Sequence, residues 1–89
     1  MTVEEVCSDT VALLRLHVAT EADPSALQRL LSHFQNINVV PRRVVAEVGA
    51  TGMLHVQIDV AGLPEGRLSV ISEKIGQVAC VLNSYWQRM

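Results

Sequence analysis

The sequence predicts a single α+β domain with a ferredoxin-like βαββαβ fold. The prediction rests on two stretches with apolar residues at helical spacing, four strand-like stretches, and the order in which they follow one another. Right-handed crossovers then give a four-stranded antiparallel sheet with strand order 4-1-3-2 and both helices on one face. We expect residues 1–10 to be a polar N-terminal lead-in and residues 11–89 to form the domain.

The first part of the domain predicts a strand followed by a helix. Residues 11–19 form the strand, with alternate side chains on opposite faces. Asp23 is the expected N-cap of the helix, with Pro24 at the first helical position, where its missing N–H costs nothing. Asn36 is the expected end, because asparagine tolerates the left-handed conformation that closes many helices. The predicted buried stripe is Leu27, Leu30, Leu31 and Phe34.

The rest of the chain predicts two strands, a helix and a last strand. Residues 38–49 form the second strand, and Pro41 indicates a position at the sheet edge, because proline cannot donate to a neighbouring strand. A turn at 49–52 leads to a third strand at 53–61, a helix that ends at Gly76, and a last strand at 79–89. The residues expected to face the core are Val44, Ala46, Val48, Leu54, Val56, Ile58, Val60, Leu68, Ile71, Ile75 and Val78.

The face of the sheet without helices is predicted to be half apolar. Such open faces, together with an edge strand that carries proline, are typical of small sheets that pair with another copy or another protein. The residues expected on this open face are Val11, Leu13, Arg15, His17, Val45, Met53, His55, Gln57 and Asp59.

Composition and charge restrict the function. The chain is 49% hydrophobic and 18% charged, which is too apolar for a disordered protein and favours a buried interface in so short a domain. The net charge of −2 and the scattered basic residues argue against nucleic acid. No stretch predicts a membrane span or a signal peptide. Cys7 and Cys80 have no CxxC spacing, so we expect free thiols in a cytoplasmic protein.

No motif for a nucleophile, a phosphate loop or a cofactor occurs, so we expect no catalytic residue, no cofactor and no metal. His17, His55 and Asp59 form the one arrangement that keeps a small metal site or enzyme as a further hypothesis, although polar decoration of a sheet is commoner. Tyr85 and Trp86 allow two interpretations, an anchor for a partner or a side chain that closes the edge of the core.

The element order, the helix start DPSALQRLL and the junction NINVV resemble an ACT domain, a small regulatory module that binds amino acids. The resemblance covers residues 11–86. Asn38 matches the junction asparagine of that family, Ile37 its apolar neighbour, and Leu27 its first buried helix residue. Ser25 stands where the family usually has a glycine that lets a ligand carboxylate approach the backbone, and Asn36 replaces the junction glycine.

The resemblance implies a regulatory protein rather than an enzyme. A free-standing ACT domain of this length resembles the small regulatory subunit of acetohydroxyacid synthase, which implies a homodimer, a larger metabolic enzyme as partner, and a free amino acid at the subunit interface. The residues that it marks for ligand binding are Asp23, Pro24, Ser25, Ala26 and Asn38. The alternative is a protein-interaction module that keeps the fold and has lost the amino-acid site.

Overall fold

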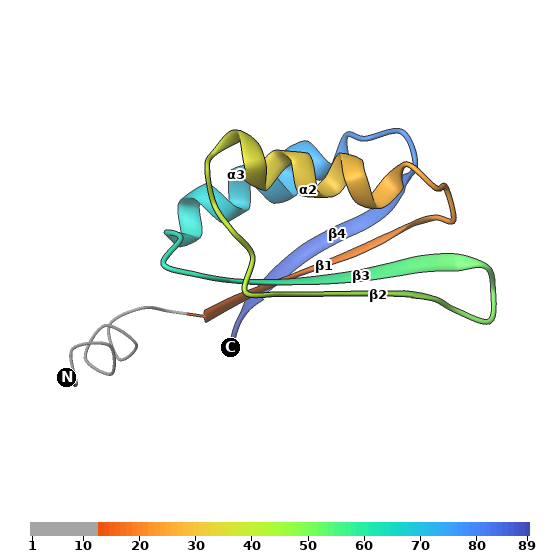
Figure 1. Ribbon diagram of the computed structural model, residues 1–89, viewed down its shortest axis with the longest axis horizontal. Helices are drawn as coiled ribbons and strands as arrows, with labels where there is room; N and C mark the ends of the chain where they lie inside the picture. The colour runs from red at the N-terminus through yellow and green to blue at the C-terminus, as the bar shows by residue number, and fades with distance from the viewer. Residues whose placement is uncertain (1–12) are drawn as a thin grey trace.

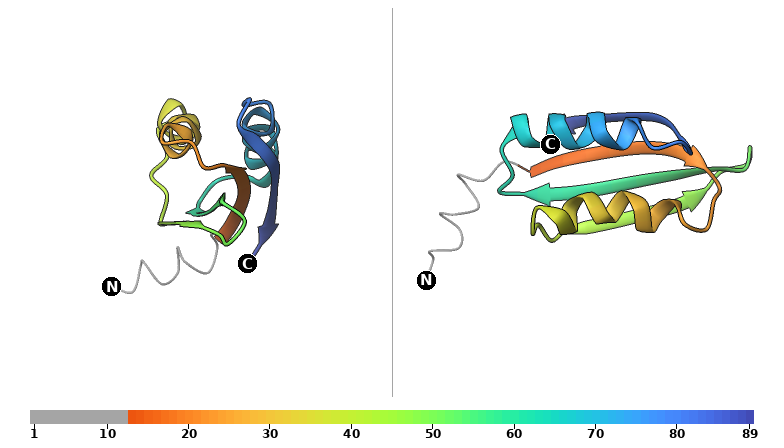
Figure 2. Two further views of the ribbon diagram at one scale, coloured as in Figure 1. Left: turned by 90° about the vertical axis from the view of Figure 1, so that its right-hand side faces the viewer. Right: turned by 90° about the horizontal axis from the view of Figure 1, so that it is seen from above.

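The computed structural model describes residues 13–89, so the lead-in expected at residues 1–10 lies outside the described part of the chain. The elements are β1 (Leu13–Glu21), α2 (Ala26–Asn36), β2 (Arg43–Val48), β3 (Met53–Ala61), α3 (Glu65–Gly76) and β4 (Val81–Arg88). The strands form one antiparallel sheet in the order β2-β3-β1-β4, which is the predicted order read from the other edge. Both helices lie on one face of it (Figures 1 and 2). The predicted ferredoxin-like fold is confirmed.

The hydrophobic core lies between the sheet and the two helices. Alternation along β1 sends every second side chain toward the helices, and the register places each of these opposite an apolar residue of β3, such as Leu16 opposite Ile58. The almost fully buried residues that the sequence pattern assigned to the core are Leu14, Leu16, Val18, Leu30, Phe34, Val56, Ile58, Val60, Leu68, Ile71 and Ile75. Thr20 is also fully buried, which the pattern did not predict.

The edge strand β2 departs from its prediction in length and burial. It begins at Arg43 rather than at residue 38, so Pro41 precedes the strand. Val44 lies opposite Ile58 on the helix side of the sheet, as predicted, but it is 38% exposed, and Val48 is 64% exposed. The expected burial of Val44, Ala46 and Val48 is therefore wrong. The edge position is confirmed, and an edge strand is buried only if a helix or a partner covers it.

Helix α3 packs against β4 and closes the other edge of the core. It follows Pro64 and ends at Gly76, as predicted. Trp86 of β4 packs against the core and its indole Nε1 donates a hydrogen bond to Ser69 Oγ at 3.1 Å, while Ser72 and Ser84 share a bond of 2.9 Å. Neither helix of the described residues is long and apolar enough to cross a membrane.

Candidate functional site

The Asp23 carboxylate forms hydrogen bonds in the turn that precedes α2. One carboxylate oxygen of Asp23 accepts hydrogen bonds from the backbone N–H and the hydroxyl of Ser25, both at 2.8 Å. The bond from the backbone N–H, followed by the bond from the hydroxyl, lowers the pKa of Asp23 below its ordinary value. The helix begins at Ala26 with Ser25 at the N-cap position, after a turn at residues 24–25, so the predictions of Asp23 as N-cap and Pro24 as first helical residue are wrong. The Asp23 carboxylate instead closes the turn that precedes the helix. A ligand carboxylate would meet this negative charge.

The end of α2 corrects the expected roles of the two asparagines. Asn36 is the last helical residue, and the left-handed conformation belongs to Asn38, with a φ of 60°. Val39 N–H donates to the carbonyl of Phe34, and Asn38 N–H donates to that of Gln35, both at 3.0 Å. This pair of bonds is a Schellman motif with Asn38 at its left-handed position. The prediction of Asn36 as the left-handed cap is wrong, and Asn38 has a backbone role of its own.

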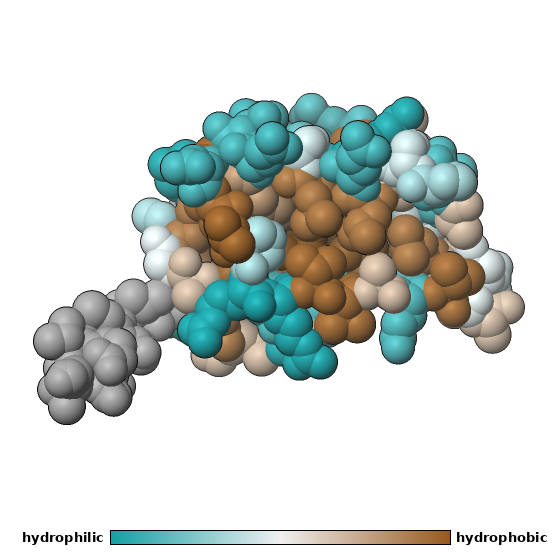
Figure 3. Space-filling view, viewed as in Figure 1, coloured by the Kyte–Doolittle hydropathy of each residue, from teal (hydrophilic) through white to brown (hydrophobic). Residues whose placement is uncertain are grey.

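A long apolar groove separates α2 from the edge strand β2. Its volume is about 820 Å³. Figure 3 shows the hydrophobic surface of this side of the molecule in brown, between α2 and β2. Within residues 13–89, no charged side chain lines it. The apolar residues along it include Leu27, Leu31, Val39, Val40, Pro41 and Val44. Sequence reasoning did not identify this groove, although Pro41 had indicated the exposed edge beside it.

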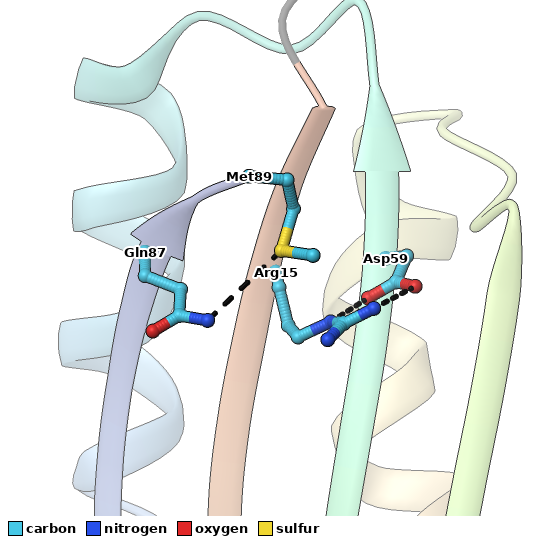
Figure 4. A network of polar contacts seen from close by, with 4 residues as sticks. All are labelled: Arg15, Asp59, Gln87 and Met89. Carbon is cyan, nitrogen blue, oxygen red and sulfur yellow. Dashed lines mark hydrogen bonds and ion pairs between the residues drawn. The ribbon is translucent and has the colours of Figure 1, made fainter.

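The open face of the sheet mixes apolar and polar side chains, and an ion pair connects two of its strands. Arg15 of β1 reaches across to Asp59 of β3, with Nε to Oδ1 at 2.8 Å and the second nitrogen to Oδ2 at 3.1 Å (Figure 4). Asp59 is only 5% exposed, so its expected exposure is wrong, because the guanidinium covers it. The hydrogen bond from Arg15 lowers the pKa of Asp59, against the opposing effect of burial.

The histidines of this face do not join Asp59 in one site. His17 and His55 line a hollow beside β2, whereas Asp59 is held by Arg15, and no group of three or more metal-ligating side chains occurs in the described part of the chain. The His17 ring stacks on Tyr85, with ring centroids 4.7 Å apart and an angle of 14°. Its Nε2 is buried and has no hydrogen-bond partner among residues 13–89. Trp86, the neighbour of Tyr85 in sequence, packs against the hydrophobic core, which matches the interpretation of one C-terminal aromatic as a side chain at the core edge.

Comparison with known proteins decides the family. A family model described as an ACT-like domain matches residues 7–89. The chain belongs to this ACT-like family. The resemblance read from the helix start and the junction is thus confirmed at the level of the family. None of the curated protein sequences matches it significantly.

Solved structures share the fold of this ACT-like domain at low sequence identity. The ACT domain of a GTP pyrophosphokinase from Chlorobium tepidum superposes with a TM-score of 0.70 at 13% identity, covering 89% of this chain and 99% of that one. The C-terminal domain of the MgtC protein from Mycobacterium tuberculosis gives 0.72 at 10% identity, covering 89% and 88%. An uncharacterised protein from Thermotoga maritima gives 0.70 at 14% identity, covering 89% and 98%. At these identities the likeness shows the fold alone.

The ligand residues implied by the resemblance lie at two ends of α2 in this ACT-like domain. Pro24 and Asn38 line the groove, but the helix between them has 11 residues and is about 16 Å long. Asp23 and Ser25 are bonded to each other, and Ala26 is fully buried in the core. One small ligand therefore cannot contact both ends of α2 within a single ACT-like subunit.

The left-handed position of Asn38 in the ACT-like domain gives a stability prediction. We expect Asn38→Val to lower the free energy of unfolding by about 1–2 kcal/mol, because a β-branched residue is strained at positive φ. Asn38→Gly, which has no such strain, should stay within about 0.5 kcal/mol of the parent protein. Urea unfolding monitored by circular dichroism measures both. Equal stability of the valine and glycine variants would contradict the assigned conformation.

Proposed function

We propose that this ACT-like domain is a non-enzymatic regulatory module that acts as a homodimer, binds a free amino acid at the subunit interface and modulates a larger enzyme of amino-acid metabolism. The observation that carries the proposal is the apolar groove between α2 and β2, next to a sheet edge that no other strand of the described residues pairs with. The valines of this region, Val40, Val44 and Val48, are 85%, 38% and 64% exposed. Apolar side chains gathered at a strand edge favour a partner over water.

A second copy suits this edge because the contact is the same on both subunits. Among residues 13–89, no strand pairs with the outer side of β2, and two such strands related by a two-fold axis can pair in antiparallel fashion. The same arrangement brings two grooves together and covers the exposed valines. It also offers a way to bring the N-terminal end of one α2 near the Asn38 end of another, since both ends are too far apart in one chain.

The partner enzyme is proposed from the family resemblance. The chain resembles the small regulatory subunit of acetohydroxyacid synthase, so the catalytic subunit of that enzyme is the first candidate. Co-purification from the native host and the activity of the isolated catalytic subunit, with and without this chain, test the partner. A catalytic subunit that neither binds the chain nor responds to it would remove this enzyme from the proposal.

A ligand-free interaction module is the second candidate, and the start of α2 favours it. Asp23 already occupies the backbone N–H of Ser25 and keeps a negative charge there, so an amino-acid carboxylate is repelled. The groove of this chain, within its described residues, also offers no charged side chain to a zwitterion. In this case the domain holds its enzyme partner through the same edge and has no small-molecule response.

Dimer formation is tested at Val44, which lines the groove without belonging to the buried core. The parent protein should sediment as a dimer in analytical ultracentrifugation, and Val44→Lys should sediment as a monomer, because a charge is then placed in an apolar interface. The matched control is Val70→Lys on α3, a residue that is 49% exposed and lies outside the groove. A parent protein that is monomeric at every concentration, or a Val70→Lys variant that dissociates equally, would contradict the proposed interface.

Amino-acid binding is tested by thermal unfolding with a panel of free amino acids at millimolar concentration. We expect at least one of them to raise the melting temperature of the dimer and not that of Val44→Lys, because stabilisation follows from binding to the folded dimer alone. A stable dimer whose melting temperature no amino acid raises would favour the ligand-free interaction module. Ser25→Gly, which restores the glycine usual in the family, then serves as a check: the absence of a response in this variant too supports the same conclusion.

A further inference from the structure

The open face of the sheet holds a hollow above Ala19, away from both helices. Cross-strand register arranges this face in rows. One row consists of Val45, Gln57, His17 and Tyr85. The next row consists of Glu47, His55, Ala19 and Asn83. Because Ala19 carries only a methyl group among longer side chains, the centre of the second row is recessed, and the resulting hollow has a volume of about 320 Å³.

The side chains that line the hollow favour a positively charged ligand. Glu47 is the one carboxylate among its lining residues, and no lysine or arginine from the described part of the chain lines it. The side chains of Gln57 and Asn83 supply carbonyl oxygens that accept hydrogen bonds. The stacked rings of His17 and Tyr85 form an aromatic wall, and the face of such a ring attracts a cation.

The second observation concerns the imidazole of His17, which lines the hollow. His17 Nε2 is buried and meets no donor or acceptor within residues 13–89, although hydrogen-bonding side chains surround the hollow. Tyr85, which stacks on this imidazole, is 51% exposed, so its ring can move without disturbing the core. Displacement of the Tyr85 ring by a ligand would expose this nitrogen to an N–H donor.

We propose that this hollow binds a small organic cation, a protonated primary amine on a short aromatic or apolar body. The ammonium group lies between the Glu47 carboxylate and the acceptors of the Ala19 row, and the body of the ligand packs against Tyr85. An uncharged compound of the same shape lacks the attraction to Glu47 and to the aromatic wall. The hollow lies on the opposite face of the sheet from the groove, so this site does not depend on the proposed function.

The test uses phenethylamine as the probe and phenethyl alcohol as its uncharged counterpart, each titrated into the full chain. Two-dimensional amide spectra should show saturable changes with millimolar phenethylamine at residues 17–19, 45–47, 55–57 and 83–85. Phenethyl alcohol should leave these signals unchanged. Equal effects of both compounds, changes confined to the α2–β2 groove, or no saturable change with phenethylamine would each overturn the proposal.

Two variants separate the site from non-specific binding. Ala19→Leu should abolish the response because the leucine side chain fills the hollow. Amide signals of core residues that match those of the parent protein would show that this variant is folded. Glu47→Gln should weaken binding about fivefold, the modest factor expected for an exposed ion pair. The matched control, Glu73→Gln on the exposed side of α3, should bind like the parent protein. Undiminished binding by Ala19→Leu, or equal affinities of the two glutamine variants, would overturn the site.

Discussion

Asp59→Ala should lower the free energy of unfolding at neutral pH by about 2–3 kcal/mol. The substitution leaves the Arg15 guanidinium partly buried without its partner, and breaking such a pair costs about 3–5 kcal/mol when both groups are fully buried. We expect the smaller value because the Arg15 side chain is 22% exposed, whereas that of Asp59 is 7% exposed. Urea unfolding of the parent and the variant measures the difference, with the exposed residue changed in Glu73→Ala as the control.

The same pair gives a pH dependence with a definite sign. The pKa of Asp59 is lower in the folded protein than in the unfolded chain, mainly through the bond from Arg15. Its contribution to stability is therefore complete above the unfolded pKa of about 3.9 and is lost as the pH falls through the folded pKa. The stability difference between the parent and Asp59→Ala should shrink below about pH 4. A difference that stays constant down to acid unfolding would contradict the ion pair.

The double variant Arg15→Met with Asp59→Leu distinguishes the net stabilisation that the ion pair provides from the cost of leaving one charge unpaired. Replacing both partners by apolar residues removes the stranded charge, so the double variant should be clearly more stable than Asp59→Ala. A double variant as unstable as the single one would mean that the loss comes from the backbone or from packing at residue 59 rather than from the unpaired arginine.

Phe34→Ala should lower the free energy of unfolding by about 3–5 kcal/mol, the largest effect that we expect from a single residue. Phe34 is 1% exposed and contributes to the core from α2, and it also lines the inner wall of the groove. Alanine is the better helix former, so the loss measures packing rather than helix propensity. Thermal and urea unfolding of Phe34→Ala and Phe34→Leu provide the measurement, and leucine should restore much of the stability. A Phe34→Ala variant that unfolds like the parent protein would show that this side chain is not packed as described.

The fold was predictable from the sequence because its core follows regular periods. Leu14, Leu16 and Val18 alternate along β1, and Leu30 and Phe34 repeat along α2, so the spacing alone assigns them to the core. The burial of β2 was not predictable in the same way, because Val44 and Val48 have the correct alternation but stay exposed, and no helix of residues 13–89 covers them. Alternation shows which side of a strand a residue occupies, and it does not show whether anything covers that side.

The candidate sites were less predictable because they depend on contacts between distant segments. Asn36 and Asn38 are the same residue type two positions apart, and only the backbone bonds to Phe34 and Gln35 decide which of them is left-handed. Arg15 and Asp59 were both placed on the open face, but their pairing requires the β1–β3 register, in which they are direct neighbours. The register likewise creates the hollow, since Ala19 becomes a recess only between His55 and Asn83.

The short strand β2 belongs to two surfaces at once. Its even-numbered residues, such as Val44, line or border the groove, and its odd-numbered residues, such as Glu47, border the hollow. Substitutions can therefore alter one surface and leave the other intact. An insertion or deletion of a single residue within 43–48 has a different result, because it moves every following side chain to the opposite face. We expect this segment to tolerate changes of residue type far better than changes of length.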